Sequence, residues 1–356
     1  MIFFVAPEQE TWCMEAYLGQ EGHEMTGRIR IITFEEIAAR QEIPLGTYIF
    51  AAIDQLSPTE NEIAQRCCAA LDRANRGITL LNRPGEVLCR YDLLAKCFEL
   101  QRNTFRVRRV SQFCRPLNFP VFIRNERRHT GSLSRLLYTR GQLIRALGKA
   151  VFSGNDPRHT MIVEYRDTVD SSGIFREYCA SIVGRQILPQ AVVHSRNWVT
   201  KWSARLIDAE KVREDVEYAE RNPYAGWLKE TFELAHVQYG RIDYGVKDGV
   251  PQVWEINTNP MIVRPATWAP NSLTPEQRSL HAPIRARFLA GLQAAFEAID
   301  SPLNPGQTLR IEVSPEQRRR LKVEKRWLQH GNRWDWRTGT HSPPTTHSAP
   351  LTRPVK

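Results

Sequence analysis

Short apolar runs alternate with helix-like segments over the first 85 residues. The runs FFVA, RIRIITF, TYIFAAI and GITLLN are rich in β-branched and aromatic residues, as strands are. Between the last two runs, SPTE at 57–60 has a capping Ser, a Pro at the first helical position and a Glu three residues after the cap. This order predicts a small α/β domain with parallel strands over residues 1–85, with a helix that runs to about residue 75.

The pattern continues as a second mixed segment over residues 86–300. Expected helices follow Arg90, run from Thr139 to about Lys149, cover 208–238 with a break near Asn222, and cover 275–299. Expected strands are FPVFIR, MIVEY and the pair FREYCASIV and RQILPQAVVHS. The polar segment at 127–132 shows no apolar periodicity and is expected to be a loop.

The C-terminal part differs in composition. SPEQ at 314–317 predicts the start of a basic helix, so residues 301–337 are expected to form a basic helical extension. Residues 338–356 are rich in Pro, Thr and Ser and are expected to be disordered. The net charge of the chain is +10, and residues 315–356 alone hold ten Lys or Arg and three Asp or Glu. The rest of the chain is therefore not broadly basic, and an anionic partner for the tail stands as a hypothesis beside a merely solvated helix.

The segment RIDYGVKDGVPQVWEINTNP, residues 241–260, reads as a β-hairpin with a turn near Gly249. Because side chains alternate along a strand, the odd positions share one face and the even positions the other. The turn places Asp243 across from Glu255, with Asn257 on the same face. The even-numbered Ile242, Tyr244, Val246, Trp254 and Ile256 are expected to face the core, with Val253 on the polar face.

Two carboxylates that face each other repel unless a positive group lies between them. Oxygen ligands without His or Cys suit a hard cation such as Mg²⁺, which keeps other positions for water and phosphate oxygens. The face is therefore expected to be a Mg²⁺ and polyphosphate platform. A surface hairpin with solvated acids is the alternative.

The segment WEINTNP, about a dozen residues after an Asp, resembles the metal-binding hairpin of ATP-grasp enzymes. The preceding segments agree in order: FPVFIR, the loop HTGS, MIVEY and an Arg-bearing antiparallel pair. The likeness is to enzymes of the glutathione synthetase and ribosomal-protein glutamate ligase type. It implies an α/β fold with a small Rossmann-like N-terminal domain and a two-part ATP-grasp domain, with a lid subdomain at about 120–200 and the metal hairpin at 240–260.

The resemblance also implies roles for individual residues. Asp243, Glu255 and Asn257 would hold one or two Mg²⁺ ions, with Mn²⁺ as a substitute, at the phosphates of ATP. The remaining nucleotide contacts would come from Arg124 in place of the family's usual Lys, the lid residues Gly131 and Ser132, Glu164 and Tyr165 at the adenine, and Asp170 at the ribose. Arg176 and Lys201 would act in catalysis near the γ-phosphate.

The implied activity is an ATP- and Mg²⁺-dependent ligase that activates a carboxylate as an acyl phosphate for attack by an amine. A kinase of the same fold acting on a hydroxyl is an alternative, and a non-catalytic nucleotide- or anion-binding protein is another. The identity of the substrate remains open. It is expected to be an amino acid, a small peptide, or the terminus of a peptide or protein. Seven arginines favour an anionic substrate, unless they are merely scattered over the surface: Arg83, Arg90, Arg106, Arg108, Arg109, Arg115 and Arg264.

The N-terminal run MIFFVA reads as a strand and not as a signal peptide, and no apolar run approaches the roughly 20 residues of a membrane span. The seven cysteines show no zinc-binding spacing and suggest reduced thiols. A cytoplasmic location is therefore expected.

Overall fold

The computed structural model describes residues 1–74, 77–129, 131–200, 205–266 and 274–330, and also 333–335 and 340–342. Within this part of the chain, helices and several sheets form a mixed α/β fold, which confirms the predicted class. Five 3₁₀ helices accompany the longer elements: η1 (Glu8–Glu10), η2 (His23–Met25), η3 (Ile53–Gln55), η4 (Val110–Gln112) and η5 (Pro157–His159). None of the described helices is long and apolar enough to cross a bilayer.

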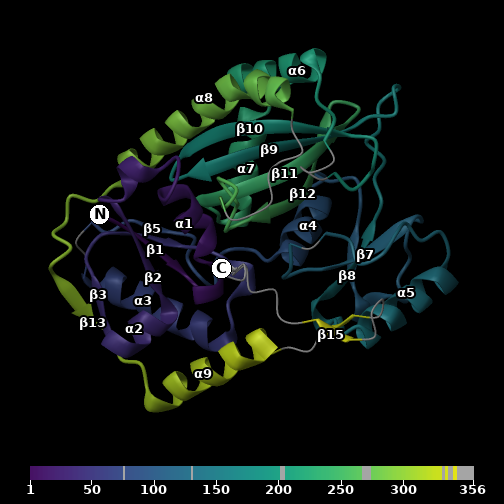
Figure 1. Cartoon of the computed structure of the whole chain (residues 1–356). Coiled ribbons are helices and arrows are strands. Elements are labelled where there is room, and N and C mark those ends of the chain that lie inside the picture. The colour runs from purple at the N-terminus through teal and green to yellow at the C-terminus, as the bar shows by residue number, and fades with distance from the viewer. Residues whose placement is uncertain are drawn as a thin grey trace, which may run out of the picture.

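The N-terminal sheet is parallel and has the strand order β2-β1-β4-β5. Its strands are β1 (Ile2–Ala6), β2 (Ile29–Thr33), β4 (Thr47–Phe50) and β5 (Leu80–Leu81). They lie in the four apolar runs of the first 85 residues, so the predicted parallel α/β unit is confirmed. In Figure 1 this sheet forms one side of the molecule.

Both faces of this sheet are buried, which explains why its strands are almost continuously apolar. Phe3 and Phe50 belong to a core that includes residues of α2 (Phe34–Arg40) and α3 (Pro58–Ala74). Phe4 and Ile49 point into a second core shared with α1 (Trp12–Leu18) and α8 (Pro275–Ile299).

The predicted start of α3 is also confirmed. The Ser57 Oγ accepts a hydrogen bond from the Glu60 N–H at 3.2 Å, and the Glu60 carboxylate accepts one from the Ser57 N–H at 2.7 Å. These bonds satisfy two backbone donors that the first turn of a helix leaves free.

A four-stranded antiparallel sheet of order β10-β9-β11-β12 forms the centre of the molecule (Figure 1). Its strands are β9 (Phe175–Val183), β10 (Gln186–Ser195), β11 (Tyr239–Lys247) and β12 (Val250–Asn257). The helices α6 (Ala209–Arg221) and α8 pack on β10, and α7 (Ala225–Ala235) follows a break at Asn222, whose φ of 41° ends α6. This break is where the sequence predicts it.

A smaller sheet of order β6-β8-β7 lies beside the central one. Its strands are β6 (Val107–Arg109), β7 (Val121–Asn125) and β8 (Thr160–Glu164). The helix α4 (Arg90–Glu99) contacts β6 and β12, and α5 (Arg140–Phe152) packs on β7. Figure 1 shows this sheet and α5 at the edge of the molecule opposite the N-terminal sheet.

The C-terminal extension returns to the N-terminal domain. The strand β13 (Thr308–Arg310) pairs with β3 (Glu42–Pro44), and α9 (Pro315–His330) contacts α2 and α3. Leu321 of α9 is buried in the core of the N-terminal sheet. Beyond α9, the segments β14 (Arg333–Asp335) and β15 (Thr340–Ser342) pair antiparallel, so the predicted disordered tail lies, apart from β15, outside the described residues.

Candidate active site

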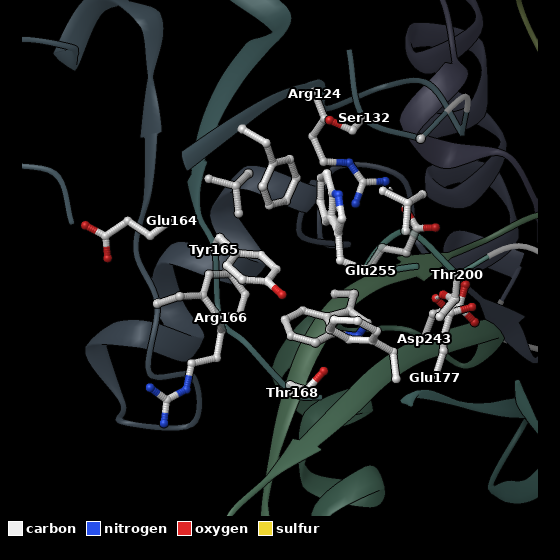
Figure 2. A pocket seen from close by; sticks show the side chains of 18 of the residues that line it. Arg124, Ser132, Glu164, Tyr165, Arg166, Thr168, Glu177, Thr200, Asp243 and Glu255 are labelled. Carbon is white, nitrogen blue, oxygen red and sulfur yellow. Dashed lines mark hydrogen bonds and ion pairs between the residues drawn. The ribbon is translucent and has the colours of Figure 1, made fainter. Parts of the chain in front are cut away.

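A pocket of about 940 Å³, counting its open mouth, lies between the central sheet and the small sheet. Aromatic side chains line much of it: Phe105, Phe122, Tyr165, Phe175, Trp198 and Trp254. Charged side chains gather at one end, where Figure 2 shows Glu177 and Asp243 close together near Thr200. A pocket with aromatic walls and charged groups at one end suits a ligand with an aromatic base and an anionic part.

The hairpin places its two carboxylates as the alternation of the sequence predicts. Asp243 of β11 pairs directly with Glu255 of β12, and both side chains line the pocket. Beyond this pair the register shifts, because Tyr244 pairs with Val253 and Trp254 is the extra residue of a β-bulge. The predicted faces of Trp254 and Val253 are therefore wrong. Trp254 lines the pocket, and Val253 is fully buried in the core.

Asp243 is buried, with 4% of its surface exposed, and is neutralised by its own strand. The Arg241 Nε donates to its Oδ1 at 2.8 Å and the Arg241 Nη2 to its Oδ2 at 2.9 Å. This two-pronged ion pair fixes the carboxylate plane in the site.

Glu255 lies between two arginines that come from distant parts of the sequence. Its Oε2 is 2.5 Å from the Arg90 Nη2 at the start of α4 and 2.6 Å from the Arg124 Nη2 on β7. Burial alone would raise the pKa of Glu255, but the charges of Arg90 and Arg124 hold that pKa well below its ordinary value. Glu255 is thus an anion at neutral pH.

Arg90 also shapes the loop that leads toward the expected lid. Its Nη1 donates to the carbonyl oxygens of Asn125, Glu126 and Arg128 at 2.9, 3.1 and 3.0 Å. The Nε atoms of Arg90 and Arg124 are buried and have no partner among the described residues. Burial and the charge of Arg90 lower the pKa of Arg124 from its ordinary value. Of the two, Arg124 lines the pocket, and its guanidinium is suited to bind phosphate oxygens.

Glu177 is a site residue that the sequence reasoning missed. It lies on β9 next to β11, and ligand atoms of Glu177, Cys179 and Asp243 lie within 4.8 Å of one another. Burial and the charge of Asp243 raise the pKa of Glu177 to about 8, and its carboxylate accepts a hydrogen bond from the Thr200 hydroxyl. The strand pattern of FREYCASIV puts these odd positions on one face, but the pairing with β11 that turns this face to Asp243 is not visible in the sequence.

The predicted adenine contacts are Glu164, which ends β8, and Tyr165, which follows it. The Glu164 carboxylate accepts hydrogen bonds from the backbone N–H groups of Asn118 at 2.8 Å and Arg106 at 3.0 Å. Figure 2 shows this carboxylate pointing away from the pocket, while the Tyr165 ring lies at the pocket against Trp198, with ring centres 5.7 Å apart. Glu164 therefore ties the segments that precede β6 and β7 to β8, and its contact with adenine stays a prediction.

Arg176 lines the pocket, but its guanidinium already has two acidic partners. It pairs with Asp170 at 2.5 Å and with Glu214 at 2.7 Å. Asp170 is not among the residues that line the pocket, and its Oδ1 accepts the Ser172 N–H in a turn. Lys201 lies outside the described residues, and its role stays a prediction.

The two residues predicted to belong to a lid lie at the pocket. Gly131 and Ser132 both line the pocket, and Gly131 has a φ of +82°, which only glycine adopts at little cost. The Ser132 hydroxyl donates to the Ile123 carbonyl at 3.2 Å, which ties the loop to β7.

Asn257 follows Glu255 on β12 but lies outside the set of pocket-lining residues. Its Oδ1 accepts the Asn259 N–H at 2.8 Å. The candidate metal ligands at the charged end of the pocket are thus the carboxylates of Asp243, Glu255 and Glu177. Their hard oxygen atoms fit Mg²⁺.

No family model matches the sequence, and no curated protein matches it. Among solved structures, D-alanine–D-alanine ligase from Bacillus anthracis, complexed with ATP, aligns at a TM-score of 0.44 and 15% identity, over 84% of this chain and 96% of the other. A RimK domain protein ATP-grasp from Sphaerobacter thermophilus aligns at 0.40 and 13% identity, over 83% and 98%.

An L-amino acid ligase from Bacillus licheniformis aligns at a TM-score of 0.40 and 11% identity, over 86% of this chain and 78% of the other. All three alignments have TM-scores below 0.5 and identities of 15% or less. At such scores and identities they assign no activity, which depends on the side chains of the pocket.

Proposed function

We propose that the chain is an ATP-grasp ligase that uses Mg²⁺ and ATP to join a carboxylate to an amine. The observation that carries the proposal is the pairing of Asp243 with Glu255 at the charged end of an aromatic pocket, beside Arg90 and Arg124. Carboxylates for a cation and guanidinium groups for phosphate thus meet in one place.

The two ends of the pocket would bind different parts of the nucleotide. Trp254 packs against Phe105 and Trp198 against Phe122, with ring centres 5.4 and 5.0 Å apart, so the apolar end offers flat surfaces to a purine. Arg124 at the charged end would contact the phosphates. Its planar fork can hold two oxygens at once, which the family's usual Lys cannot.

Asp243 and Glu255 would hold the Mg²⁺ ion, with the Glu177 oxygen within reach of Asp243. When bound, the ion neutralises charge on the transferred phosphoryl group. Arg241 orients the Asp243 carboxylate and compensates its charge, and Arg90 compensates the charge of Glu255. Gly131 and Ser132 border the pocket, where the loop would exclude water from the reactive acyl phosphate.

The test is ADP release from the purified chain with Mg²⁺, ATP and a panel of amino acids and dipeptides. A ligase releases ADP and phosphate only when both a carboxylate and an amine are present. Added hydroxylamine would then yield a hydroxamate, because it attacks the acyl phosphate. A phosphorylated product that resists hydroxylamine would instead identify a kinase, and ADP release with no change on Asp243→Asn or Glu255→Gln would refute the metal assignment.

A further inference from the structure

The positive charge of the chain is unevenly distributed. Residues 100–159 hold thirteen Lys or Arg and two Asp or Glu, while the net charge of the whole chain is +10. This segment contains β6, β7 and α5, and Figure 1 shows α5 at the edge of the molecule opposite the N-terminal sheet. No acidic residue occurs between Glu126 and Asp156. The edge that carries α5 is therefore strongly basic, and of these cations the proposed ligase chemistry uses only Arg124.

Several of these cations already have partners inside the protein. Four arginines form ion pairs with acids, namely Arg102, Arg109, Arg124 and Arg158. Arg127 donates to the backbone oxygens of Asp54 and Leu56. Five further cations are exposed and have no acidic partner among the described residues: Arg115, Arg135, Arg140, Arg145 and Lys149. These five side chains are open to an anionic partner from solution.

The five exposed cations gather around α5. Arg140, Arg145 and Lys149 lie on the helix itself, one turn or slightly more apart. The Arg140 Nη2 donates to the Cys114 carbonyl at 3.3 Å, which brings the segment with Arg115 beside the first turn of the helix. Arg135 lies in the segment that leads into α5. We call these five residues the basic surface.

Two aromatic side chains are exposed beside these cations. Tyr138, two residues before α5, is 61% exposed, and Phe113, two residues before Arg115, is 37% exposed. Exposed rings give an unpaired base a face on which to stack. Four of the five cations are arginines, whose planar guanidinium binds phosphate oxygens through two donors at once. Exposed rings among exposed arginines are typical of surfaces that bind single-stranded nucleic acid.

A lipid surface fits α5 less well. A helix that lies on a membrane turns its large apolar side chains toward the lipid. In α5, however, Leu143 and Leu147 pack into the core beneath the small sheet, and the exposed face carries Gly141 and Gly148. The apolar side chains that are exposed alternate with these glycines and with the cations: Ile144, Val151 and Phe152. The exposed face of α5 thus lacks the continuous apolar band of a membrane-binding helix.

We propose that the basic surface and Tyr138 bind a single-stranded nucleic acid. The five cations would contact phosphate oxygens, and the Tyr138 ring would stack on a base. The inference goes beyond the proposed ligase function and does not rest on it, because none of these residues lines the pocket.

The first test measures affinity and its dependence on salt. A labelled oligouridine of about twelve nucleotides is titrated with the full chain in about 50 to 200 mM KCl, and binding is followed by fluorescence anisotropy. Five phosphate contacts predict a slope of log K against log[KCl] of about −3.5, because each contact on a single strand contributes about −0.7. A slope near zero, or no binding at the lowest salt, would overturn the proposal.

The second test locates the site. Arg140→Gln combined with Arg145→Gln should weaken binding at least tenfold and make the slope shallower by about 1.4, since two phosphate contacts are lost. Arg66→Gln combined with Arg73→Gln removes the same charge from exposed positions of α3, on the other side of the molecule in Figure 1. This matched control should stay within about twofold of the wild type.

The two double variants decide between a site and a general charge effect. Each must melt within about 3 °C of the wild type, which shows that it is folded. Equal losses of affinity in both would mean that only net charge is read, and this result would overturn the proposal. Full affinity of Arg140→Gln combined with Arg145→Gln would overturn it as well, because binding would then lie elsewhere on the chain.

The third test separates a nucleic acid from other anions. Tyr138→Leu should weaken binding of oligouridine at least fivefold, and an RNA duplex of the same length should bind more weakly, because paired bases cannot stack on the ring. Tighter binding of oligouridine or of oligothymidine identifies RNA or DNA as the source of the ligand. Equal binding of an oligoglutamate of the same charge, or preferential binding to phosphatidylserine vesicles, would refute the proposal. These measurements involve no turnover, so they leave the ligase proposal untouched.

Discussion

At the scale of single residues, the site is a set of buried charges that compensate one another. Asp243 has Arg241, and Glu255 has Arg90 and Arg124. Removing one member of a buried pair leaves the other charge without compensation, which typically costs about 3–5 kcal/mol. Each residue of the site therefore affects both chemistry and stability, and a test of one needs a measurement of the other.

We expect Glu255→Gln to abolish ADP release, by at least 100-fold, because the amide cannot supply a charged oxygen to the metal. It should also lower the melting temperature, since Arg90 and Arg124 lose their shared anion. Arg83→Gln, which breaks the more exposed pair with Asp72, is the control and should leave turnover within about twofold. Full turnover of Glu255→Gln would contradict the assignment.

Asp215 allows a pH prediction away from the pocket. Burial raises its pKa to about 6, although its Oδ1 accepts the Val192 N–H at 2.7 Å. Since the folded pKa exceeds the ordinary value of 3.8, the fold favours the protonated form. Stability is therefore lost as pH rises from about 4 to 6, by up to about 3 kcal/mol.

Asp215→Asn keeps an acceptor for Val192 and removes the ionisation. We expect its melting temperature to exceed that of the wild type at pH 7.5, with a smaller difference at pH 5. Glu217→Gln on the exposed side of α6 should change stability by no more than about 0.5 kcal/mol at either pH. A lower melting temperature of Asp215→Asn at pH 7.5 would show that the carboxylate is net stabilising.

At the scale of elements, local signals in the sequence were reliable where a single element decides the outcome. The Ser57 and Ser314 capping boxes both form, and the alternation in β11 and β12 puts Asp243 opposite Glu255. The bulge at Trp254 was not predicted, because an extra residue in one strand follows from packing against Phe105 and from the pairing, not from alternation.

The helix α9 is a second case in which context decides. Its basic composition suggested a solvated extension, whereas Leu321 is 4% exposed and packs into the N-terminal core. We expect Leu321→Ala to cost about 2–5 kcal/mol in free energy of unfolding, measured by urea denaturation. Val323→Ala on the same helix, where the side chain is 47% exposed, should cost far less. Equal effects of the two substitutions would mean that α9 does not dock as described.

At the scale of the whole molecule, the pocket collects side chains from α4, β7, β9, β11 and β12, which span residues from about 90 to 255. The sequence predicted most of the elements and, through the resemblance, named Asp243, Glu255 and Arg124, which line the pocket and whose roles stay predictions. It did not predict that Glu177 faces Asp243, that Arg90 pairs with Glu255, or that Glu164 binds backbone amides, because these contacts depend on how separate sheets meet.

The way in which the elements meet also pairs buried acids of the site with arginines. Two acids of the pocket, Asp243 and Glu255, pair with arginines from three different elements.

The central claim is that Asp243 and Glu255 hold the metal ion of a bound nucleotide. The most direct measurement is the affinity for a non-hydrolysable ATP analogue with and without Mg²⁺, by titration calorimetry, in the wild type and in Asp243→Asn combined with Glu255→Gln. We predict that Mg²⁺ strengthens binding at least tenfold in the wild type and has no effect in a double variant that remains folded. An equal Mg²⁺ effect in both proteins would contradict the claim.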